Sequence, residues 1–391
     1  MTVGEFIDGL ASATTGTGLF ILGAFLSNLG ALKGDFDDED KWFEKLRGHQ
    51  EYSIELFGVS YTINWAAPSS VPMFMGAAFS SFQSDEDGNW FDNLLSMGAS
   101  GLEPVLELTM LQGINNALDA VSYAEDNEKL WTLGGNILTS YATQGIPTIG
   151  GKIANVIDDK RRTKYIDPSK GSVTLQTMWD TFSKKVPFLS KTRAEYIDAW
   201  GREQYTGNVI ERFFAQFVSP GYASTIDPDP IYDELKAIKE ATGEAGVYPE
   251  APRKYITVVG NRRDLTKEEY YNVATMSGQT KMNLVNEAMD HKFYDQLTDK
   301  QKAEVIMNIY KYANSLAITS ELDFTLDEIK TGLGDKKGSV LTESRWNGFS
   351  FEQQQYLTHE AFMDGVITAY KYEQNGGSAA EYFILKALKN N

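Results

Sequence analysis

An uncharged stretch from Gly9 to Leu32 constrains the fold more than any other part of the chain. No charged residue lies between Asp8 and Lys33. Small residues recur there in steps of about three and four, interrupted by Phe20, which places them along one narrow stripe of a helix. Such a stripe lets another helix backbone approach closely, in a protein core, between subunits or in a membrane. The stripe residues that we single out as candidates for helix packing or membrane contact are Gly16, Gly23, Ser27, Gly30 and Gly34.

Large apolar side chains occupy the other faces of this stretch. A helix that is apolar nearly all round must be covered by protein or by lipid. A spanning helix needs about 20 mainly apolar residues, and the most apolar part, Leu19–Leu32, is shorter than that. We therefore favour a buried core helix or a re-entrant segment over a stable membrane span.

The charge balance and the histidine and cysteine counts exclude several function classes. The chain has 391 residues, with 54 acidic and 36 basic side chains and a net charge of −18. Proteins that coat nucleic acids usually present a basic face, so that role is disfavoured. The chain contains no cysteine and 3 histidines, which excludes disulfides and thiolate ligands and leaves few parts for zinc sites or catalytic triads. We expect no cofactor and no metal site.

The pattern of charges predicts a mainly α fold with three regions. Long uncharged windows dominate up to about residue 155, and the rest is ordinarily charged. We expect an apolar, glycine-rich helical domain over residues 1–160. A loop-rich middle region with short helices and a small hairpin would cover residues 161–260, and a C-terminal helical domain residues 261–391.

Two short segments predict β-hairpins. Polar and apolar residues alternate over Glu51–Trp65 about a central Gly58, a pattern typical of paired strands. A second hairpin is expected where Lys254–Val259 meets a Gly-Asn turn and returns through Arg263–Leu265.

Helix start signals are clearest in the C-terminal region. Thr266, Thr298 and Thr325 are each followed three residues later by Glu or Gln, which is the capping-box pattern. Helices are also expected over Ile231–Thr242, Arg193–Arg202 and Asn208–Val218. The glycine-rich run Gly332–Gly338 predicts a flexible connection.

Glu103 and Glu107 lie four residues apart amid apolar residues. Two carboxylates on one helix face can bind a metal or act as an acid–base pair. They can equally be the polar edge of an amphipathic helix, and this second interpretation is favoured because no histidine lies nearby in the sequence.

Lys160, Arg161, Arg162 and Lys164 form the one dense basic cluster in the sequence. Such a cluster can contact phosphate or lipid headgroups. The alternative is a solvated helix end, where cations complement the helix dipole, and we favour this alternative.

Several blocks of the sequence resemble a known family. In order they are TGTGLFILGAFLSNLG, FEKLRGHQEYSIELFGVSYTINWAAPSSVPMFMGA, LEPVLELTMLQGINNAL, ATQGIPTIGGKI, YIDAWGRE and FVSPGYASTIDPDPIYDEL. Together they resemble a module associated with the large polyvalent proteins of tailed phages and mobile elements of Firmicutes-type bacteria. The resemblance runs from the start to about Ala313.

The resemblance implies a setting but no catalytic residue. Members of that family are thought to be packaged with DNA and to enter the recipient cell with it. We therefore expect a non-enzymatic phage virion protein, internal or ejected, that assembles with itself and with other virion proteins. It would form a conduit through which DNA passes as cargo. It would also contact the host membrane transiently.

Two other functions stay open at this point. The first alternative is a soluble interaction module of a giant polyvalent protein that acts in the recipient cytoplasm on host defence or transcription. The second is an unrecognised hydrolase that uses Glu103 and Glu107, which we regard as the weakest of the three because paired carboxylates without geometry are common.

Overall fold

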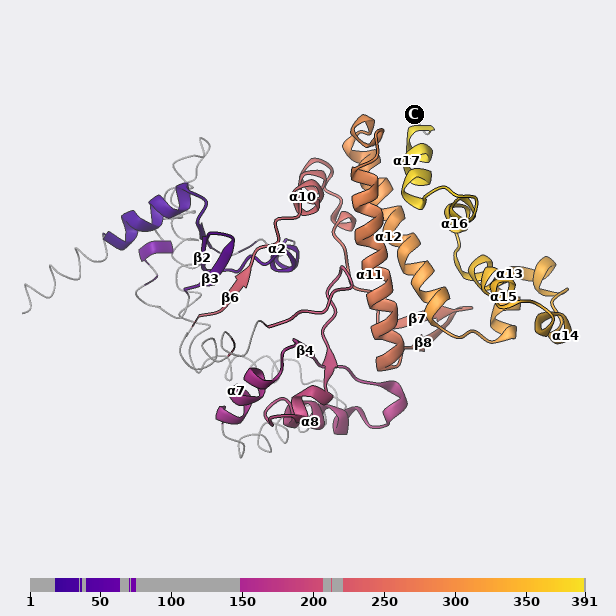
Figure 1. Cartoon of the computed structure of the whole chain (residues 1–391), viewed down its shortest axis with the longest axis horizontal. Helices are drawn as coiled ribbons and strands as arrows, with labels where there is room; N and C mark the ends of the chain where they lie inside the picture. The colour runs from indigo at the N-terminus through magenta and orange to yellow at the C-terminus, as the bar shows by residue number, and fades with distance from the viewer. Residues whose placement is uncertain are drawn as a thin grey trace, which may run out of the picture. The chain divides into compact units, whose positions relative to one another are not determined.

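The computed structural model describes most of the chain in separate ranges. These ranges are residues 18–34, 36, 40–63, 70, 72–74, 148–206, 212 and 221–389. Within them the chain is mainly α-helical with small antiparallel strand pairs, as expected (Figure 1). Two compact units emerge, one formed by residues 1–145 and 209–228 and the other by residues 146–208 and 229–391. The three-region division made from the sequence stays a prediction.

The first unit contains an antiparallel sheet in the order β1-β2-β3-β6. The elements of this unit are β1 (Leu32–Lys33), α2 (Lys41–Arg47), β2 (Ser53–Leu56), β3 (Val59–Thr62) and β6 (Ala223–Thr225). The hairpin expected over residues 51–65 is therefore confirmed. Its turn residues Phe57 and Gly58 have φ angles of 54° and 78°, and two consecutive positive φ values suit the right-handed twist of paired strands.

A helix over residues 18–28 packs against this sheet. Leu19 and Leu26 contact a buried apolar cluster that includes Tyr52 and Phe74. Gly23 permits the approach, because a Cβ atom there would lie 1.9 Å from the carbonyl oxygen of Met73. One face of this helix thus belongs to the core of the first unit.

The second unit is built mainly of helices, with two short strand pairs, β4–β5 and β7–β8. Its strands are β4 (Arg162–Thr163), β5 (Ala194–Glu195), β7 (Tyr255–Val258) and β8 (Asn261–Asp264). Its helices are α7 (Thr148–Ile157), α8 (Val173–Ser183), α10 (Ile231–Thr242), α11 (Lys267–Met289), α12 (Asp299–Glu321), α13 (Leu326–Gly338), α14 (Glu343–Asn347), α15 (Phe351–Phe362), α16 (Ile367–Gln374) and α17 (Ala379–Lys389). Short 3-10 helices are η2 (Pro168–Lys170), η3 (Leu189–Thr192), η5 (Ala245–Val247) and η6 (Tyr294–Gln296).

The longest helices of this unit, α11 and α12, lie side by side (Figure 1). Both begin at the predicted capping boxes: Thr266 and Thr298 each accept a hydrogen bond from the backbone N–H three residues on. The same reciprocal arrangement starts α13 at Thr325. Ser350 makes a fourth box at α15 that the sequence analysis did not single out.

The β7–β8 hairpin covers one end of the α11–α12 pair. Ile256 and Val258 of β7 join an apolar cluster with Val273 of α11 and Ala317 of α12. The predicted second hairpin is therefore confirmed, with Val259 and Gly260 in its turn rather than Gly260 and Asn261.

Two sequence-based expectations are wrong. Residues 193–202 form no helix, because Asp198 Oδ1 accepts hydrogen bonds from the backbone N–H groups of Trp200 and Arg202 and so holds a turn. The run 332–338 is mostly helical, but α13 consists of two helical segments that meet at a kink at Gly334, whose φ and ψ are 76° and 172°. The helix expected over residues 208–218 falls almost wholly outside the described ranges.

Within the described ranges, no helix combines the length and the apolar character needed to cross a bilayer.

A close backbone contact at Gly278 supplies the first test of this fold. A Cβ atom there would lie 1.9 Å from Gly201 N and 2.3 Å from Trp200 C. We expect Gly278→Ala to lower the free energy of unfolding by about 2 kcal/mol, because the overlap exceeds the gain of about 1 kcal/mol in helix propensity. Urea denaturation measures the change.

Asn272→Ala is the matched control, since Asn272 is an exposed residue of the same helix. Its effect should stay within about 0.5 kcal/mol. Equal stability of the two variants would contradict the close approach of α11 to the Trp200–Gly201 turn.

Candidate functional site

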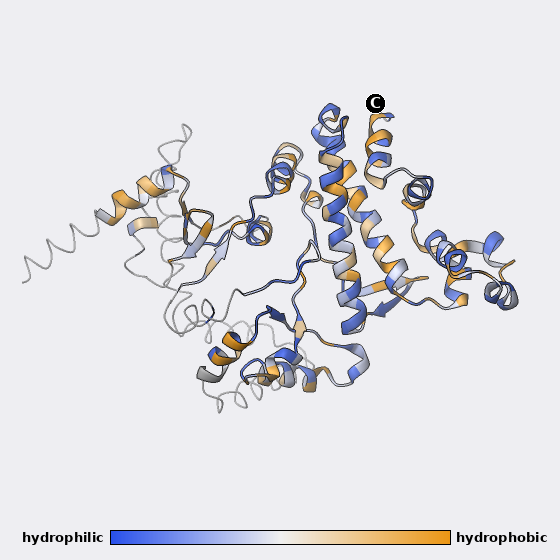
Figure 2. Cartoon of the chain, in the orientation of Figure 1, coloured by the Kyte–Doolittle hydropathy of each residue, from blue (hydrophilic) through white to orange (hydrophobic). Residues whose placement is uncertain are grey.

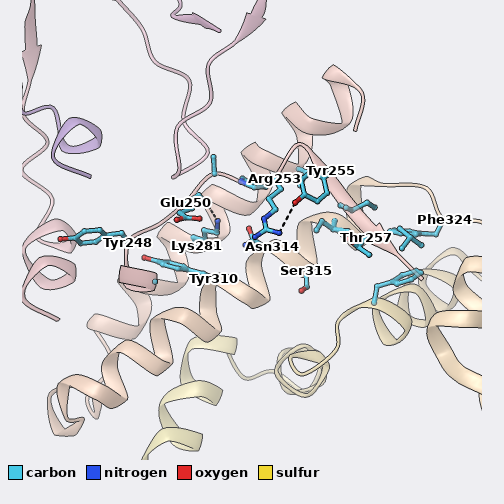
Figure 3. Close-up of a pocket in the computed structure, with 18 residues that line it drawn as sticks. Tyr248, Glu250, Arg253, Tyr255, Thr257, Lys281, Tyr310, Asn314, Ser315 and Phe324 are labelled. Atoms are coloured by element: carbon cyan, nitrogen blue, oxygen red, sulfur yellow. Dashed lines mark hydrogen bonds between the residues drawn. The ribbon is translucent and has the colours of Figure 1, made fainter. Parts of the chain in front are cut away.

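A pocket of about 530 Å³ lies in the second unit, between β7, helices α11 and α12, and the segment that precedes β7 (Figure 3). That volume falls in the range of small-molecule sites. Its lining comprises Gly246, Tyr248, Glu250, Ala251, Pro252, Arg253, Tyr255, Ile256, Thr257, Val258, Val273, Lys281, Tyr310, Asn314, Ser315, Ile318, Phe324 and Phe362.

The two long helices present one face each to this pocket. Val273 and Lys281 lie eight residues apart on α11, and Tyr310, Asn314 and Ile318 follow one another at four-residue steps on α12. Residues four and eight apart share a helix face. Ser277 donates a hydrogen bond of 2.5 Å to Asn314 Oδ1 and ties the two helices together in this region.

Lys281 is the buried charge of the site. The residue is 1% exposed. Its Nζ donates a hydrogen bond of 2.7 Å to the Glu250 carbonyl oxygen. The ammonium also lies 5.7 Å from the centre of the Tyr310 ring, within cation–π range. Burial lowers the pKa of Lys281 to about 8, with the Glu250 carboxylate acting in the opposite direction.

Tyr310 is held in place from its other sides. Its hydroxyl donates to the Val247 carbonyl oxygen at 2.8 Å, and the buried Trp200 ring meets it edge to face at 6.4 Å. Burial raises the pKa of the Tyr310 hydroxyl well above its ordinary value. This tyrosine is therefore neutral and oriented across the physiological pH range.

Arg253 and Tyr255 form the rim of the pocket. The exposed Arg253 guanidinium donates a hydrogen bond of 3.3 Å to the Tyr255 hydroxyl. The Arg262 guanidinium lies over the Tyr255 ring, 4.1 Å from the ring centroid. Figure 3 shows Arg253 and Tyr255 together at this rim.

The opposite end of the pocket is aromatic. Phe324 and Phe362 stack with their ring centres 4.3 Å apart. In Figure 3, Lys281 and Phe324 lie on opposite sides of the view, with Asn314 and Ser315 between them. The pocket thus has a charged end and an apolar end.

The basic cluster predicted from the sequence lies elsewhere in the same unit and is paired with acids. Lys160 Nζ lies 3.0 Å from Glu195 and 2.8 Å from Glu203, and Arg162 contacts Asp158 at 3.0 Å and Glu195 at 3.1 Å. The hydrogen bond from Lys160 lowers the pKa of Glu203 to about 2.

The other two basic residues of the cluster, Arg161 and Lys164, have different contacts. Arg161 lies over the Tyr196 ring at 4.5 Å, while the exposed Lys164 accepts a hydrogen bond through its carbonyl oxygen. The cluster follows α7 by a few residues and continues into β4, so it does not form the last turn of a helix. Its ion pairs fasten the β4–β5 region, and phosphate contact stays a prediction.

The small-residue stripe is only partly described. Gly23 makes the one close approach among the described glycines of the stripe. The placement of Gly30 and Gly34 on the same helix is wrong, because the helix ends at residue 28, Gly30 lies in a turn with a φ of 67° and Gly34 follows β1. Both have open space where a Cβ would lie. Ser27 is half-buried on the same helix as Gly23. Gly16 lies outside the described residues, as do Glu103 and Glu107. In the described part of the chain, no group of three or more metal-ligating side chains comes together.

Lys281 and its pocket were not predicted from the sequence. The available signal was periodicity, because Lys281 falls on the face of α11 that carries Val273 and Ser277. A lysine on the buried face of a helix is unusual, and that position alone would have justified singling it out.

Comparisons with known proteins add no relative. No protein-family model, no curated protein and no solved structure matches this chain.

The depressed pKa of Lys281 predicts a pH dependence of stability. In the unfolded chain the lysine holds its proton up to about pH 10.4, whereas in the folded chain it loses the proton near pH 8. Between these values the unfolded state binds more protons, so the contribution of Lys281 to stability rises with pH. Below about pH 8 the charged Lys281 lowers the stability of the folded chain by the full cost of its burial, which is roughly 3 kcal/mol at most.

We therefore expect Lys281→Met to raise the melting temperature at pH 7 and to flatten the rise in stability between pH 8 and pH 10 relative to the wild type. Lys300→Met, at an exposed position on α12, is the control. Scanning calorimetry across this pH range measures both effects. A wild-type curve of stability against pH that runs parallel to that of Lys281→Met would contradict the lowered pKa of Lys281.

Proposed function

We propose that this chain is a non-enzymatic binding protein whose second unit holds a small ligand in the pocket lined by Lys281. The observation that carries the proposal is the buried ammonium of Lys281 at one end of a cavity whose other end is aromatic. Pockets with an apolar body and a few convergent polar groups are the usual form of ligand sites.

The composition of the lining supports binding rather than catalysis. Glu250 is the one carboxylate among the lining residues, and no histidine is among them. Lys281 gives a hydrogen bond to a backbone carbonyl, not to a side chain that could exchange protons with it. General acid–base catalysis needs a positioned partner within hydrogen-bond reach of the reacting proton.

The family resemblance of the sequence blocks, which runs from the start to about Ala313, supplies the setting of this proposal. In that setting the protein is carried in a phage or mobile-element particle, enters the recipient cell with DNA and acts there as an interaction module on host defence or transcription. The acidic composition, with a net charge of −18, fits a protein that travels with DNA without being retained by it.

A pocket-filling variant tests the binding proposal. Ser315→Trp places a large side chain at a lining position, and Ser344→Trp places the same side chain at an exposed position on α14. We expect the wild type and Ser344→Trp to be stabilised by members of a mixed library of anionic, neutral and cationic metabolites, and Ser315→Trp by none. Thermal-shift assays followed by native mass spectrometry measure this.

Two results would count against the proposal. One is stabilisation of Ser315→Trp by the same compounds as the wild type. The other is recovery of a chemically altered compound from the wild-type protein, which would indicate turnover.

A second function, assembly of a DNA-ejection conduit at the host envelope, is favoured by the helix over residues 18–28. Ile21 and Phe25 on this helix, and Leu29 directly after it, are 62%, 59% and 63% exposed. Figure 2 shows the same helix as markedly hydrophobic. Exposed apolar residues gathered on one element mark interaction surfaces with protein or lipid. In this function the partners are further copies of the chain, other virion proteins and, transiently, the membrane.

Phe25→Glu tests the assembly function, with Phe351→Glu as a control at another exposed phenylalanine. We expect Phe25→Glu alone to reduce self-association and binding to liposomes, measured by analytical ultracentrifugation and flotation. Quantitative mass spectrometry of purified particles then separates the two functions, because a conduit requires many copies per particle and a passenger few. A chain that is monomeric and indifferent to liposomes in both variants and in the wild type would contradict the assembly function.

A further inference from the structure

In the part of the chain that the structure describes, two cations of the pocket have no carboxylate within ion-pair distance. They are Lys281 and Arg253, whereas Lys160, Arg162, Arg193 and Arg202 all have one. The chain carries 54 acidic side chains against 36 basic ones. The Glu250 carboxylate acts on Lys281 from beyond ion-pair distance and raises its pKa. A buried ammonium without a close ion pair nevertheless costs free energy that a bound anion would recover.

The geometry of Lys281 leaves donors available for such an anion. An ammonium has three N–H donors, and the hydrogen bond to the Glu250 carbonyl oxygen uses one of them. The Tyr310 ring covers another direction without accepting a conventional hydrogen bond. Lys281 lines the pocket although the residue is 1% exposed, so a ligand meets its remaining donors only where the side chain borders the cavity.

Asn314 adds a neutral donor to the same wall. Its Oδ1 accepts the hydrogen bond from Ser277, so its amide NH₂ group is the part left to recognise a ligand. Among the described residues that group has no hydrogen-bond partner. It lies one helical turn from Tyr310 on the pocket face of α12.

We propose that the pocket binds a small organic anion with a flat ring, its carboxylate or phosphate paired with Lys281 and its ring directed toward the Phe324–Phe362 end. This inference rests on the proposed function, since it names the chemical class of the ligand for the same pocket. Arg253 at the rim supplies a second positive charge, and Asn314 supplies a hydrogen bond between the two ends.

The length of the site suits such a ligand. Tyr310 and Ile318 both line the pocket on one face of α12, and eight residues of helix rise about 12 Å. A ring joined to an acidic group through a short linker spans most of that distance. A bare inorganic anion would leave the aromatic end empty and forgo its apolar contact.

Matched sets of compounds test the class directly. The first set is indole-3-propionate, tryptophol and tryptamine, which share a ring and differ in carrying a negative, a neutral or a positive group. The second set is adenosine monophosphate, adenosine and inorganic phosphate. Isothermal titration calorimetry on the full chain measures their affinities, and the two sets distinguish a carboxylate from a phosphate ligand.

We expect the anionic ring compound of at least one set to bind more tightly than its neutral and cationic analogues and than inorganic phosphate. Lys281→Met should weaken that binding by about thirtyfold or more, as expected when one partner of a buried charge pair is removed. Lys300→Met should leave it unchanged. Circular dichroism confirms that both variants are folded.

The affinity should also depend on pH in a defined way. The titratable residues that line the pocket are Tyr248, Glu250, Arg253, Tyr255, Lys281 and Tyr310. Because burial holds the pKa of Lys281 near 8, affinity for the carboxylate should be constant from pH 6 to pH 7 and fall as pH rises above 8, with proton uptake on binding. Lys281→Met should show no such fall.

The outcomes separate the inference from the proposed function. Equal affinity for the neutral and anionic compounds, or unaltered anion binding by Lys281→Met, overturns the anion assignment while the pocket stays a binding site. Absence of binding by all six compounds also overturns it, and the proposed function is then decided by the metabolite screen with Ser315→Trp.

Discussion

The packing of α11 against α12 is the contact on which the second unit depends. Ser277 and Asn314 join the two helices by a hydrogen bond, and Val273 and Ala317 share an apolar cluster with the β7–β8 hairpin. Gly278 lets the Trp200–Gly201 turn approach α11 at backbone distance. Trp200 in turn packs edge to face on Tyr310, so the same set of contacts that builds the core also shapes the wall of the pocket.

Local signals in the sequence predict local structure well. The capping boxes at Thr266, Thr298 and Thr325 and both hairpins depend on residues within a few positions of each other, and all are confirmed. The pocket could not be predicted in this way. Lys281 meets the Glu250 carbonyl and the Tyr310 ring across about 30 residues of chain in either direction, and the tertiary fold alone brings them together.

Residues 193–202 show how tertiary context overrides a local pattern. RAEYIDAWGR carries good helix formers, yet Ala194 and Glu195 pair with β4 and Asp198 holds a turn with its carboxylate. The partners of Glu195, Lys160 and Arg162, are more than 30 residues away. The basic cluster and this segment were assigned separately from the sequence, and the structure joins them in one ion-pair network that stabilises the β4–β5 region.

Among the described residues, the buried ammonium of Lys281 has no carboxylate within ion-pair distance, and we propose that a bound anion pairs with it. Nuclear magnetic resonance of ¹³Cε-labelled lysine measures its pKa directly, with Lys281→Met used to assign the signal. We expect a pKa near 8 for Lys281 in the free protein and a higher pKa when indole-3-propionate or adenosine monophosphate is bound. A pKa above 10 in the free protein, unchanged by either compound, would contradict it.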